Sequence, residues 1–316
     1  RRRQGHVRRL LTRALTEYRE EGIDLAALWP FAVGFYRKLG WGIANKYTVY
    51  DLPPEQLAFG SDPEGSVRRL GPDDWNHLRR VEVAFGEGTM LSLRRTERWW
   101  RDRTLSAWDG RSEPYVYGYR RDGELRGYVL HTVERTDDGS QLRVADLAHA
   151  DDDAYRGLLR FLSAHDSQVD SVRLPRKEES ELLDRVSDPG AVDCTVNVGP
   201  MIRLTDVERA LEGRAWPEGA DVQFTLSVSD PLLEYNDETF DVRVTDGGAT
   251  VEAADPGPRG SADVEADVGT LSRLFVGSLG IDDAQRTAGL TIRDDRLREP
   301  LRGSFPQESV CMREFF

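Results

Sequence analysis

The stretch that decides the fold is residues 1–42, RRRQGHVRRLLTRALTEYREEGIDLAALWPFAVGFYRKLGWG. It opens with a basic glycine turn, and the residues that follow predict an amphipathic helix. Apolar residues recur there at intervals of three and four, which places them on one helical face: Val7, Leu10, Leu11, Ala14, Leu15 and Tyr18. Gly22 is predicted to cap the end of this helix. Residues 25–28 predict a buried strand, and residues 34–40 a short helix ended by glycine.

The glycine turn at residues 2–7 has the chemistry of an anion site. The first N–H groups of a helix lack intrahelical partners and lie at the positive end of the helix dipole. A glycine lets the backbone approach a ligand closely, so a phosphate or pyrophosphate fits there. A surface helix with a basic start explains the same turn. On the turn alone, both interpretations stay open.

Length and composition limit the class of protein. A chain of 316 residues predicts two or three domains. No apolar run approaches the length of a membrane span. The sequence does not begin with Met, and the glycine turn stands at its very start. We therefore expect a fragment of a longer chain, truncated at its N-terminus.

Cysteine and histidine usage predicts no metal centre. Cys194 and Cys311 provide no disulfide framework or metal cluster, and the five histidines show no ligand spacing. A reducing, cytoplasmic location fits best. The three aspartates at residues 151–153 could be interpreted as a metal site, but no fourth ligand lies at a recognisable spacing.

The charge of the chain points to its partners. Acidic residues number 56 against 43 basic ones, for a net charge of −13. A diffuse acidic surface argues against nucleic acid and anionic membranes as partners and favours cationic amines. Only Lys38, Lys46 and Lys177 are lysines. This acid-rich, lysine-poor composition resembles that of proteins from salt-loving organisms, and GC-rich codon usage explains it equally well.

Two further units follow the first stretch. Residues 46–52 alternate as a strand that we assign to the end of the first domain, and residues 53–65 form a Pro- and Gly-rich linker. The second unit predicts helices over 71–100, a hairpin turning at Asp122-Gly123, a helix at 153–165 and a strand at 194–204. The third unit begins with a helix capped at Thr205-Asp206 and is mainly β, with alternating strands near 222–228 and 240–253.

The first stretch resembles the C-terminal half of a GCN5-related N-acetyltransferase (GNAT) domain. Residues 2–7, RRQGHV, resemble the Q/R-x-x-G-x-G/A loop that binds coenzyme A, with Val7 in place of a small residue. Residues 35–41, FYRKLGW, resemble the YxxxGF/Y segment of that family. The second unit repeats the element order of a GNAT domain. Its corresponding turn, residues 148–153, reads AHADDD. Aspartates there would repel a pyrophosphate, so we predict that this unit binds no coenzyme A.

The whole chain resembles the enhanced intracellular survival (Eis) acetyltransferases. The resemblance implies an α+β protein with three parts: the C-terminal half of a GNAT domain (1–60), a degenerate GNAT-like domain (61–204) and a sterol-carrier-protein-2-like (SCP2-like) α/β domain (205–316). It implies transfer of acetyl from acetyl-CoA to a primary amine of an aminoglycoside-like compound, a polyamine or a lysine side chain. It also implies a homo-oligomer, specifically a hexamer. The alternative is a lipid- or small-molecule-binding protein that uses the SCP2-like domain.

The resemblance also assigns roles to particular residues. Tyr36 would be the general acid that protonates the coenzyme A thiolate. The terminal carboxylate of Phe316 would be the general base for the amine, and burial would raise its pKa into a useful range. The implied coenzyme A contacts are the residues of the first turn: Arg2, Arg3, Gln4, Gly5, His6, Val7 and Arg8.

Overall fold

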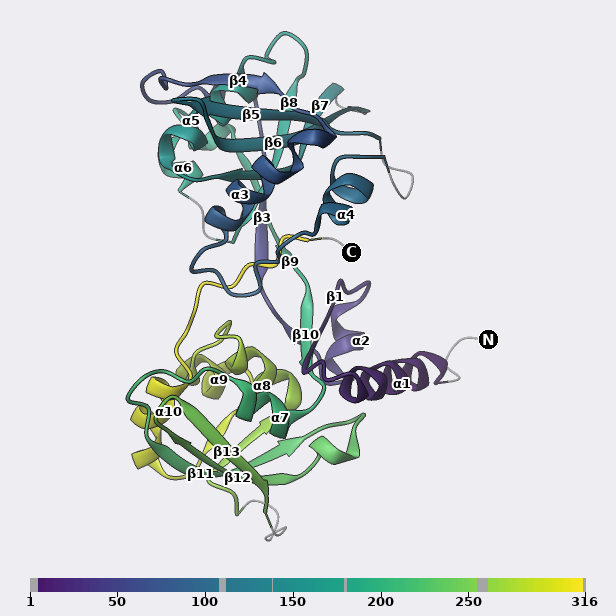
Figure 1. The fold of residues 1–316 in the computed structure, drawn as a ribbon, viewed down its shortest axis with the longest axis vertical. Coiled ribbons are helices and arrows are strands. Elements are labelled where there is room, and N and C mark those ends of the chain that lie inside the picture. Colours follow the sequence, from purple (N-terminus) through teal and green to yellow (C-terminus); the bar gives the residue numbers. More distant parts are fainter. Residues whose placement is uncertain (1–4, 108–111, 138, 179–180, 255–260, 315–316) are drawn as a thin grey trace. The chain divides into compact units, whose positions relative to one another are not determined.

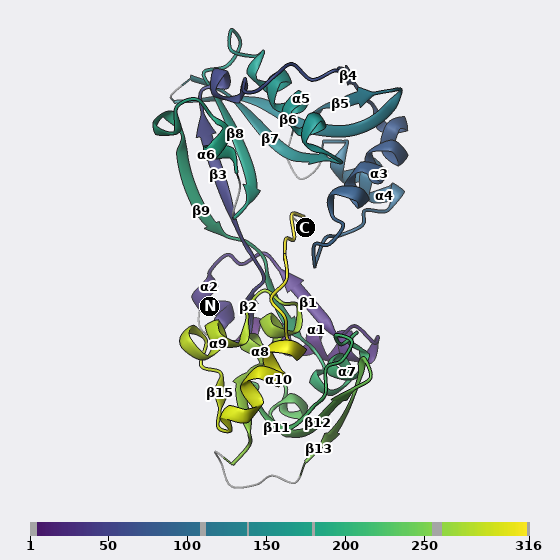
Figure 2. The same cartoon turned by 90° about the vertical axis from the view of Figure 1, so that its left-hand side faces the viewer.

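The computed structural model describes residues 5–107, 112–137, 139–178, 181–254 and 261–314. The chain divides into two compact units (Figures 1 and 2). The first unit comprises residues 1–45, 89–91 and 199–316, and the second comprises residues 46–88 and 92–198. Both units combine helices with a sheet, which confirms the predicted α+β class.

The first stretch folds as its pattern predicts. It forms α1 (His6–Glu20), β1 (Leu25–Leu28), α2 (Val33–Arg37) and β2 (Gly42–Ile43). Gly22 has a φ of 77° and donates its N–H to the carbonyl of Arg19 at 3.1 Å, just beyond the end of α1. This left-handed conformation favours glycine, so the prediction that Gly22 ends the helix is confirmed.

A three-stranded antiparallel sheet completes this region. Its order is β1-β10-β2, and the central strand, β10 (Met201–Leu204), comes from far along the chain. The sequence predicts one strand over 194–204, whereas the structure divides it at Gly199-Pro200 into β9 (Asp193–Val198) and β10. Proline has no N–H for a sheet ladder, and the two halves join different sheets.

The apolar face of α1 is only partly covered by the described residues. Leu15 is buried and Leu11 packs beside it, against Leu233 and its neighbours. In contrast, Val7, Leu10 and Tyr18 are exposed. Within the described part of the first unit, only one edge of the predicted apolar stripe is therefore covered by other side chains.

A five-stranded sheet and four helices make up the rest of the first unit. The strand order is β13-β12-β11-β14-β15, with β14 parallel to β11 and the other pairs antiparallel. The strands are β11 (Val222–Ser229), β12 (Thr239–Thr245), β13 (Gly248–Ala253), β14 (Val264–Asp267) and β15 (Thr291–Ile292). The helices are α7 (Val207–Gly213), α8 (Val268–Phe275), α9 (Ile281–Thr287) and α10 (Arg298–Ser304).

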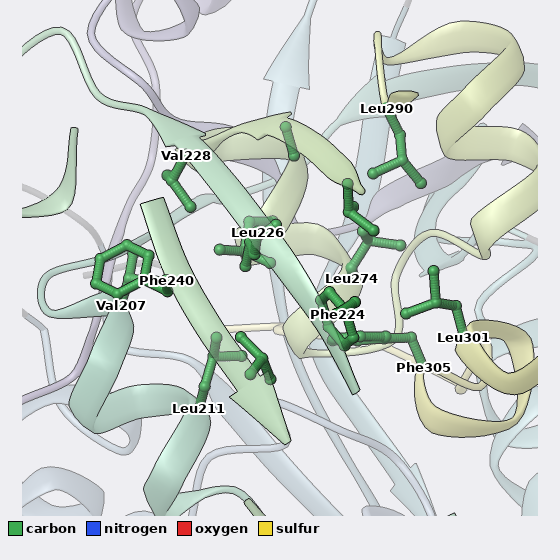
Figure 3. Packing of buried hydrophobic residues seen from close by; sticks show 14 of the residues in the cluster. Val207, Leu211, Phe224, Leu226, Val228, Phe240, Leu274, Leu290, Leu301 and Phe305 are labelled. Carbon is green, nitrogen blue, oxygen red and sulfur yellow. The ribbon is translucent and has the colours of Figure 1, made fainter. Parts of the chain in front are cut away.

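The core of this sheet follows from strict alternation along its strands. Phe224, Leu226 and Val228 of β11 point to one face, where they meet Leu274 of α8 and Phe305 beyond α10 (Figure 3). Burying such side chains stabilises the fold by about 25 cal/mol for each Å² of apolar surface. The predicted helix cap is confirmed, because the Asp206 side chain accepts the N–H of Arg209 at 3.0 Å.

The second unit is built on a seven-stranded sheet of order β4-β5-β6-β7-β8-β3-β9. Its remaining strands are β3 (Lys46–Leu52), β4 (Ser66–Arg69), β5 (Tyr115–Arg121), β6 (Glu124–Thr136), β7 (Gly139–His149) and β8 (Ser171–Lys177). We predicted strand 46–52 as the end of the first domain, but it pairs with β8 and β9 here. Its alternating pattern indicates a strand and says nothing about which sheet the strand joins.

Helices cover both faces of the seven-stranded sheet. They are α3 (Trp75–Phe85), α4 (Glu97–Trp99), α5 (Asp152–Ser163) and α6 (Leu182–Arg185). Val129 of β6 packs with α5, while its neighbours Tyr128 and Leu130 pack with α3 on the other face. The hairpin prediction is confirmed, because Asp122 and Gly123 both have positive φ, as a two-residue turn requires. The helical pattern predicted up to residue 100 breaks after α3, where Gly86 caps the helix and Gly88 has a φ of 70°.

A buried ion pair joins the two sheets of the first unit. Arg203 of β10 contacts Asp230, which follows β11, at 2.5 Å, and both side chains are 0% exposed. Arg203 also donates to the carbonyl of Leu39, at the end of α2, at 2.6 Å. Asp230 in turn accepts the backbone N–H groups of Leu232 and Leu233. The pair therefore connects α2 to the five-stranded sheet.

We expect Arg203→Met to lower the free energy of unfolding by about 3–5 kcal/mol, because it leaves Asp230 as an uncompensated buried charge. Urea denaturation of the whole chain measures this loss. Arg293→Met is the matched control, since Arg293 pairs with Glu265 at 2.9 Å on the surface of the same unit. Such exposed pairs contribute about 0–1 kcal/mol. A loss for Arg203→Met no larger than the control's would contradict this role.

Two histidines of the second unit are held neutral by their surroundings. Burial lowers the pKa of His131 to about 4, and the nearby His165 adds to the effect. Burial and the charge of Arg176 likewise lower the pKa of His149 to about 4. His131 stacks on Tyr117 with ring centroids 5.8 Å apart, and its Nδ1 has no hydrogen-bond partner in the described structure.

The second unit is expected to lose stability as the pH falls from about 6.5 to about 4. Over that range the unfolded chain takes up protons at both histidines while the folded chain does not, so unfolding becomes more favourable. Each of the two histidines accounts for about 3 kcal/mol of the stability lost at pH 4. Hydrogen exchange of the second unit across this range measures the effect. His131→Phe should flatten the pH dependence and the exposed His77→Phe should not; equal slopes in the two variants would refute the assignment.

Candidate functional site

The structure describes part of the site that the sequence predicts. Arg2, Arg3, Gln4 and Phe316 lie outside the described residues. The other predicted contacts, Gly5, His6, Val7 and Arg8, form the start of α1, and Tyr36 lies in α2.

The start of α1 has the features of an anion-binding site. Gly5 is the N-cap with a left-handed φ of 73°, and a Cβ at this position would meet nothing within 4 Å. Within the described residues no side chain caps the helix, and its first turn has no acidic residue. The first backbone bond joins the N–H of Arg9 to the carbonyl of Gly5 at 3.1 Å. The backbone N–H groups of Val7 and Arg8 thus precede this first described bond, at the end of the helix where anion sites are found.

The basic and imidazole side chains beside this turn have structural contacts. Arg8 donates to the carbonyl of Pro231, and Arg9 contacts Nδ1 of His6 at 2.8 Å. The described structure therefore offers the backbone N–H groups, with Arg8 adding positive charge nearby.

The corresponding turn of the second unit is built differently. Asp151 caps α5, with its carboxylate accepting the N–H of Ala154 at 2.9 Å. Arg121 and Arg126 both bind the same carboxylate, at 2.9 and 2.8 Å. The positive end of this helix is thus already occupied by a carboxylate of the chain. This geometry supports the prediction that the second unit has no coenzyme A seat.

Tyr36 lies in an aromatic cluster. Its side chain is 9% exposed, and its ring contacts those of Phe31, Phe35 and Trp41 edge-on, with centroids 5.2, 5.2 and 6.2 Å away. Burial raises the pKa of the Tyr36 phenol above its usual value. The phenol therefore keeps its proton at neutral pH and can donate it. Gly40, with a φ of 79°, ends this short segment, and a Cβ there would collide with Arg203.

The C-terminal segment is attached to the first unit by its backbone. Met90 donates to the carbonyl of Ser309 at 2.8 Å, and Cys311 donates to the carbonyl of Met90 at 3.1 Å. Met312 donates to the side chain of Asn45 at 2.9 Å and is buried. This part of the tail is therefore docked against the first unit.

One further bond brings the tail to the segment beside Tyr36. Nε1 of Trp29 donates to the carbonyl of Glu314 at 2.5 Å. Trp29 lies two residues before Phe31, whose ring contacts Tyr36. The short segment 29–31 therefore touches both the predicted acid and the last described residue of the tail. The sequence predicts no role for Trp29, since a contact across 285 positions leaves no local signal.

Metal and membrane features were sought in the same described residues. They contain no group of three or more His, Cys, Asp or Glu side chains arranged to hold a metal ion. None of their helices has both the length and the apolar character to span a membrane.

Three family models match the chain in succession. Models described as an acetyltransferase (GNAT) domain match residues 1–44 and 91–204, and one described as a sterol carrier protein domain matches residues 207–313. These matches follow the predicted order of domains. The ranges 1–60, 61–204 and 205–316 themselves stay a prediction, because the two compact units cross them.

Known proteins of similar sequence carry acetyltransferase names. An uncharacterized N-acetyltransferase from Streptomyces griseus is 26% identical over 307 residues, covering 87% of this chain and 69% of the relative. Another, from Streptomyces avermitilis, is 25% identical over 291 residues, covering 89% of this chain and 70% of the relative. The GNAT domain matches and these relatives support an N-acetyltransferase as the class of enzyme.

Solved structures share the fold along the whole chain. A GCN5-related N-acetyltransferase from Anabaena variabilis superimposes with a TM-score of 0.83 at 24% identity, covering 100% of this chain and 79% of that one. Eis1 from Mycobacterium abscessus gives a TM-score of 0.73 at 24% identity with the same coverage. At this identity the likeness shows the fold alone.

Proposed function

We propose that this protein transfers the acetyl group of acetyl-CoA directly to a primary amine, which is aminoglycoside-like, a polyamine or a lysine side chain. The observation that carries the proposal is the segment 29–31. Its Trp29 binds the tail at Glu314, and its Phe31 contacts Tyr36. The proposed acid and the last described residue of the tail are thereby both in contact with one short segment that follows β1, in the unit that contains the proposed pyrophosphate site at the start of α1.

The cofactor would bind at the turn before α1. Backbone N–H groups of residues 5–8 and the positive end of the helix would hold the pyrophosphate of acetyl-CoA. Arg2, Arg3 and Gln4 are assigned to the same seat by the resemblance to the coenzyme A loop.

The reaction would be a single displacement in a ternary complex. The Phe316 carboxylate takes a proton from the substrate ammonium group, and the free amine attacks the acetyl carbonyl. The C–N bond forms, the C–S bond breaks, and Tyr36 gives its proton to the departing thiolate. The amine nitrogen loses its second proton to water, and Tyr36 regains one. The products are the N-acetyl amide and coenzyme A, with one proton released overall.

The lipid-binding alternative has less support. The face of the five-stranded sheet that would hold a lipid is filled by side chains such as Phe224, Leu274 and Phe305 (Figure 3). Assembly as a hexamer, a cytoplasmic location and a salt-loving source stay predictions.

Tyr36→Phe is expected to lower kcat about 10²-fold or more, in the range of general acid catalysis, while the Kd for acetyl-CoA stays near the wild-type value. Thiol release from acetyl-CoA with a panel of polyamines and aminoglycosides measures the rate, and titration calorimetry measures Kd. Phe35→Leu, on the neighbouring ring, is the control for general damage to the cluster. If turnover by Tyr36→Phe equals that of the wild type, another group is the acid.

The base is tested by moving the terminal carboxylate. Deleting Phe316, or extending the chain by one glycine, shifts the carboxylate by one residue and should abolish most turnover. Phe316→Leu keeps the carboxylate in place and should retain most of it, because the proposed base is the main-chain carboxylate. Turnover that survives both the deletion and the extension would keep the enzyme and discard this base.

A further inference from the structure

The C-terminal tail is bonded to residues that stand where the chain passes between its two units. Asn45 is the last residue of the first unit before the chain enters the second, and Gly199 is the first after it returns. Between these points the chain comes back to the first unit once, as the segment Thr89–Leu91. The side chain of Asn45 accepts the backbone N–H of Met312 at 2.9 Å, and its carbonyl accepts the N–H of Gly199 at 3.0 Å. The tail is therefore attached to one of these passages.

The segment Thr89–Leu91 binds the same tail through its backbone. Met90 and Val310 form a parallel β-bridge. The N–H of Met90 is donated to the carbonyl of Ser309 at 2.8 Å, and the carbonyl of Met90 accepts the N–H of Cys311 at 3.1 Å. Both are main-chain bonds, so they do not depend on which side chain stands at position 90. Three successive residues of the tail are thereby fixed to one residue of the segment.

The segment adopts a strained conformation at this contact. Leu91 has a φ of 61°, in the left-handed region that a leucine rarely adopts. Its side chain and that of Val310 pack against the same small apolar cluster, which consists of Ala44, Ile202 and Val276. Strain of this kind persists only where the surrounding structure holds it, and it gathers at functional sites. The strained backbone of Leu91 therefore indicates that the contact with the tail has a function.

We propose that Met90 and Asn45 position the C-terminal tail so that its terminal carboxylate reaches the substrate amine. They do so within the proposed acetyltransferase function, on which this inference rests. Neither residue touches the reacting atoms, so both are positioning residues. Met90 belongs by sequence to the predicted second domain (61–204) and in space to the first unit. A domain predicted to bind no coenzyme A thus takes part in the reaction through the tail.

The position of the tail matters because base catalysis depends on geometry. A base must lie within hydrogen-bond reach of the proton that it removes, and a displacement of about 1 Å can lower a rate about 100-fold. Each main-chain bond to the tail raises the fraction of time that the tail is docked. An amine that is already uncharged needs no base, so the position of the tail should matter less at high pH.

Amide hydrogen exchange of the full-length protein tests the contact by removing one bond at a time. Met90→Pro removes the N–H donated to Ser309, and Met90→Leu keeps it. Exchange over residues 309–312 should be about 2- to 12-fold faster in Met90→Pro, the range for one lost hydrogen bond, and unchanged in Met90→Leu. Asn45→Ala serves the same purpose should Met90→Pro fail to fold, and Asn45→Asp, which keeps an acceptor for Met312, should restore slow exchange. Wild-type exchange in both Met90→Pro and Asn45→Ala would overturn the inference.

The pH dependence of turnover separates positioning from general damage to the fold. With the fastest acceptor of the polyamine and aminoglycoside panel, Met90→Pro and Asn45→Ala should each lower kcat about 10- to 100-fold at pH 7, while Kd for acetyl-CoA stays within twofold. The loss should shrink as the pH rises towards the pKa of the acceptor amine, about 10.4 for an alkylamine, because the free amine needs no base. Leu93→Pro, in the same loop but in the second unit, is the control for the introduced proline. A loss by the same factor at every pH would contradict a positioning role.

The two measurements also separate this inference from the proposed function. Absence of turnover with any amine in the wild type defeats the proposed function, whereas faster exchange in Met90→Pro than in Met90→Leu still supports the attachment of the tail. Normal turnover by the wild type, with faster exchange but unchanged kcat in the variants, keeps the enzyme and discards the positioning role.

Discussion

The first unit depends on the buried pair of Arg203 and Asp230. Two charges that are wholly removed from water are stable only when each is paired and hydrogen-bonded, and both conditions hold here. The guanidinium fixes the end of α2 through Leu39, and the carboxylate fixes the turn after β11 through its backbone N–H groups. The sterol-carrier-like sheet therefore supports the helix that carries Tyr36. This gives the sterol-carrier-like part of the chain a structural role beside the helix that carries Tyr36.

The sequence could predict where strands and turns lie far better than which strands pair with one another. Alternation identifies residues 46–52 as a strand, and the Asp122-Gly123 pair identifies the hairpin turn between β5 and β6, because both signals are local. The sheet that receives β3 is decided by hydrogen bonds to β8 and β9, more than a hundred positions away. A strand that joins a sheet formed by distant segments shows the same alternation as one that joins a sheet formed by its neighbours in sequence. The division of the strand predicted at 194–204 had a local sign in Pro200, which a pattern of apolar residues alone overlooks.

The same limit applies to the site. Gly5 and the helix after it can be recognised from sequence, since turn chemistry and a 3.6-residue period are properties of neighbours. Tyr36 could be chosen only through a resemblance, because a tyrosine in a short helix has no distinctive pattern of its own. The bond from Trp29 to Glu314 and the bonds from Met90 to the tail needed the structure. The two most distinctive features of the site are therefore the least visible in the sequence.

The N-termini of α1 in the first unit and α5 in the second unit differ in which groups lie beside them. Both α1 and α5 present the positive end of a helix dipole at their first turn. At α5 the side chain of Asp151 occupies the free N–H groups, and Arg121 and Arg126 neutralise it, so the charge of that turn is satisfied internally. At α1 a glycine takes the N-cap position, and no described side chain caps the helix. The two helix starts therefore differ in whether a carboxylate of the described chain already occupies the positive end of the dipole.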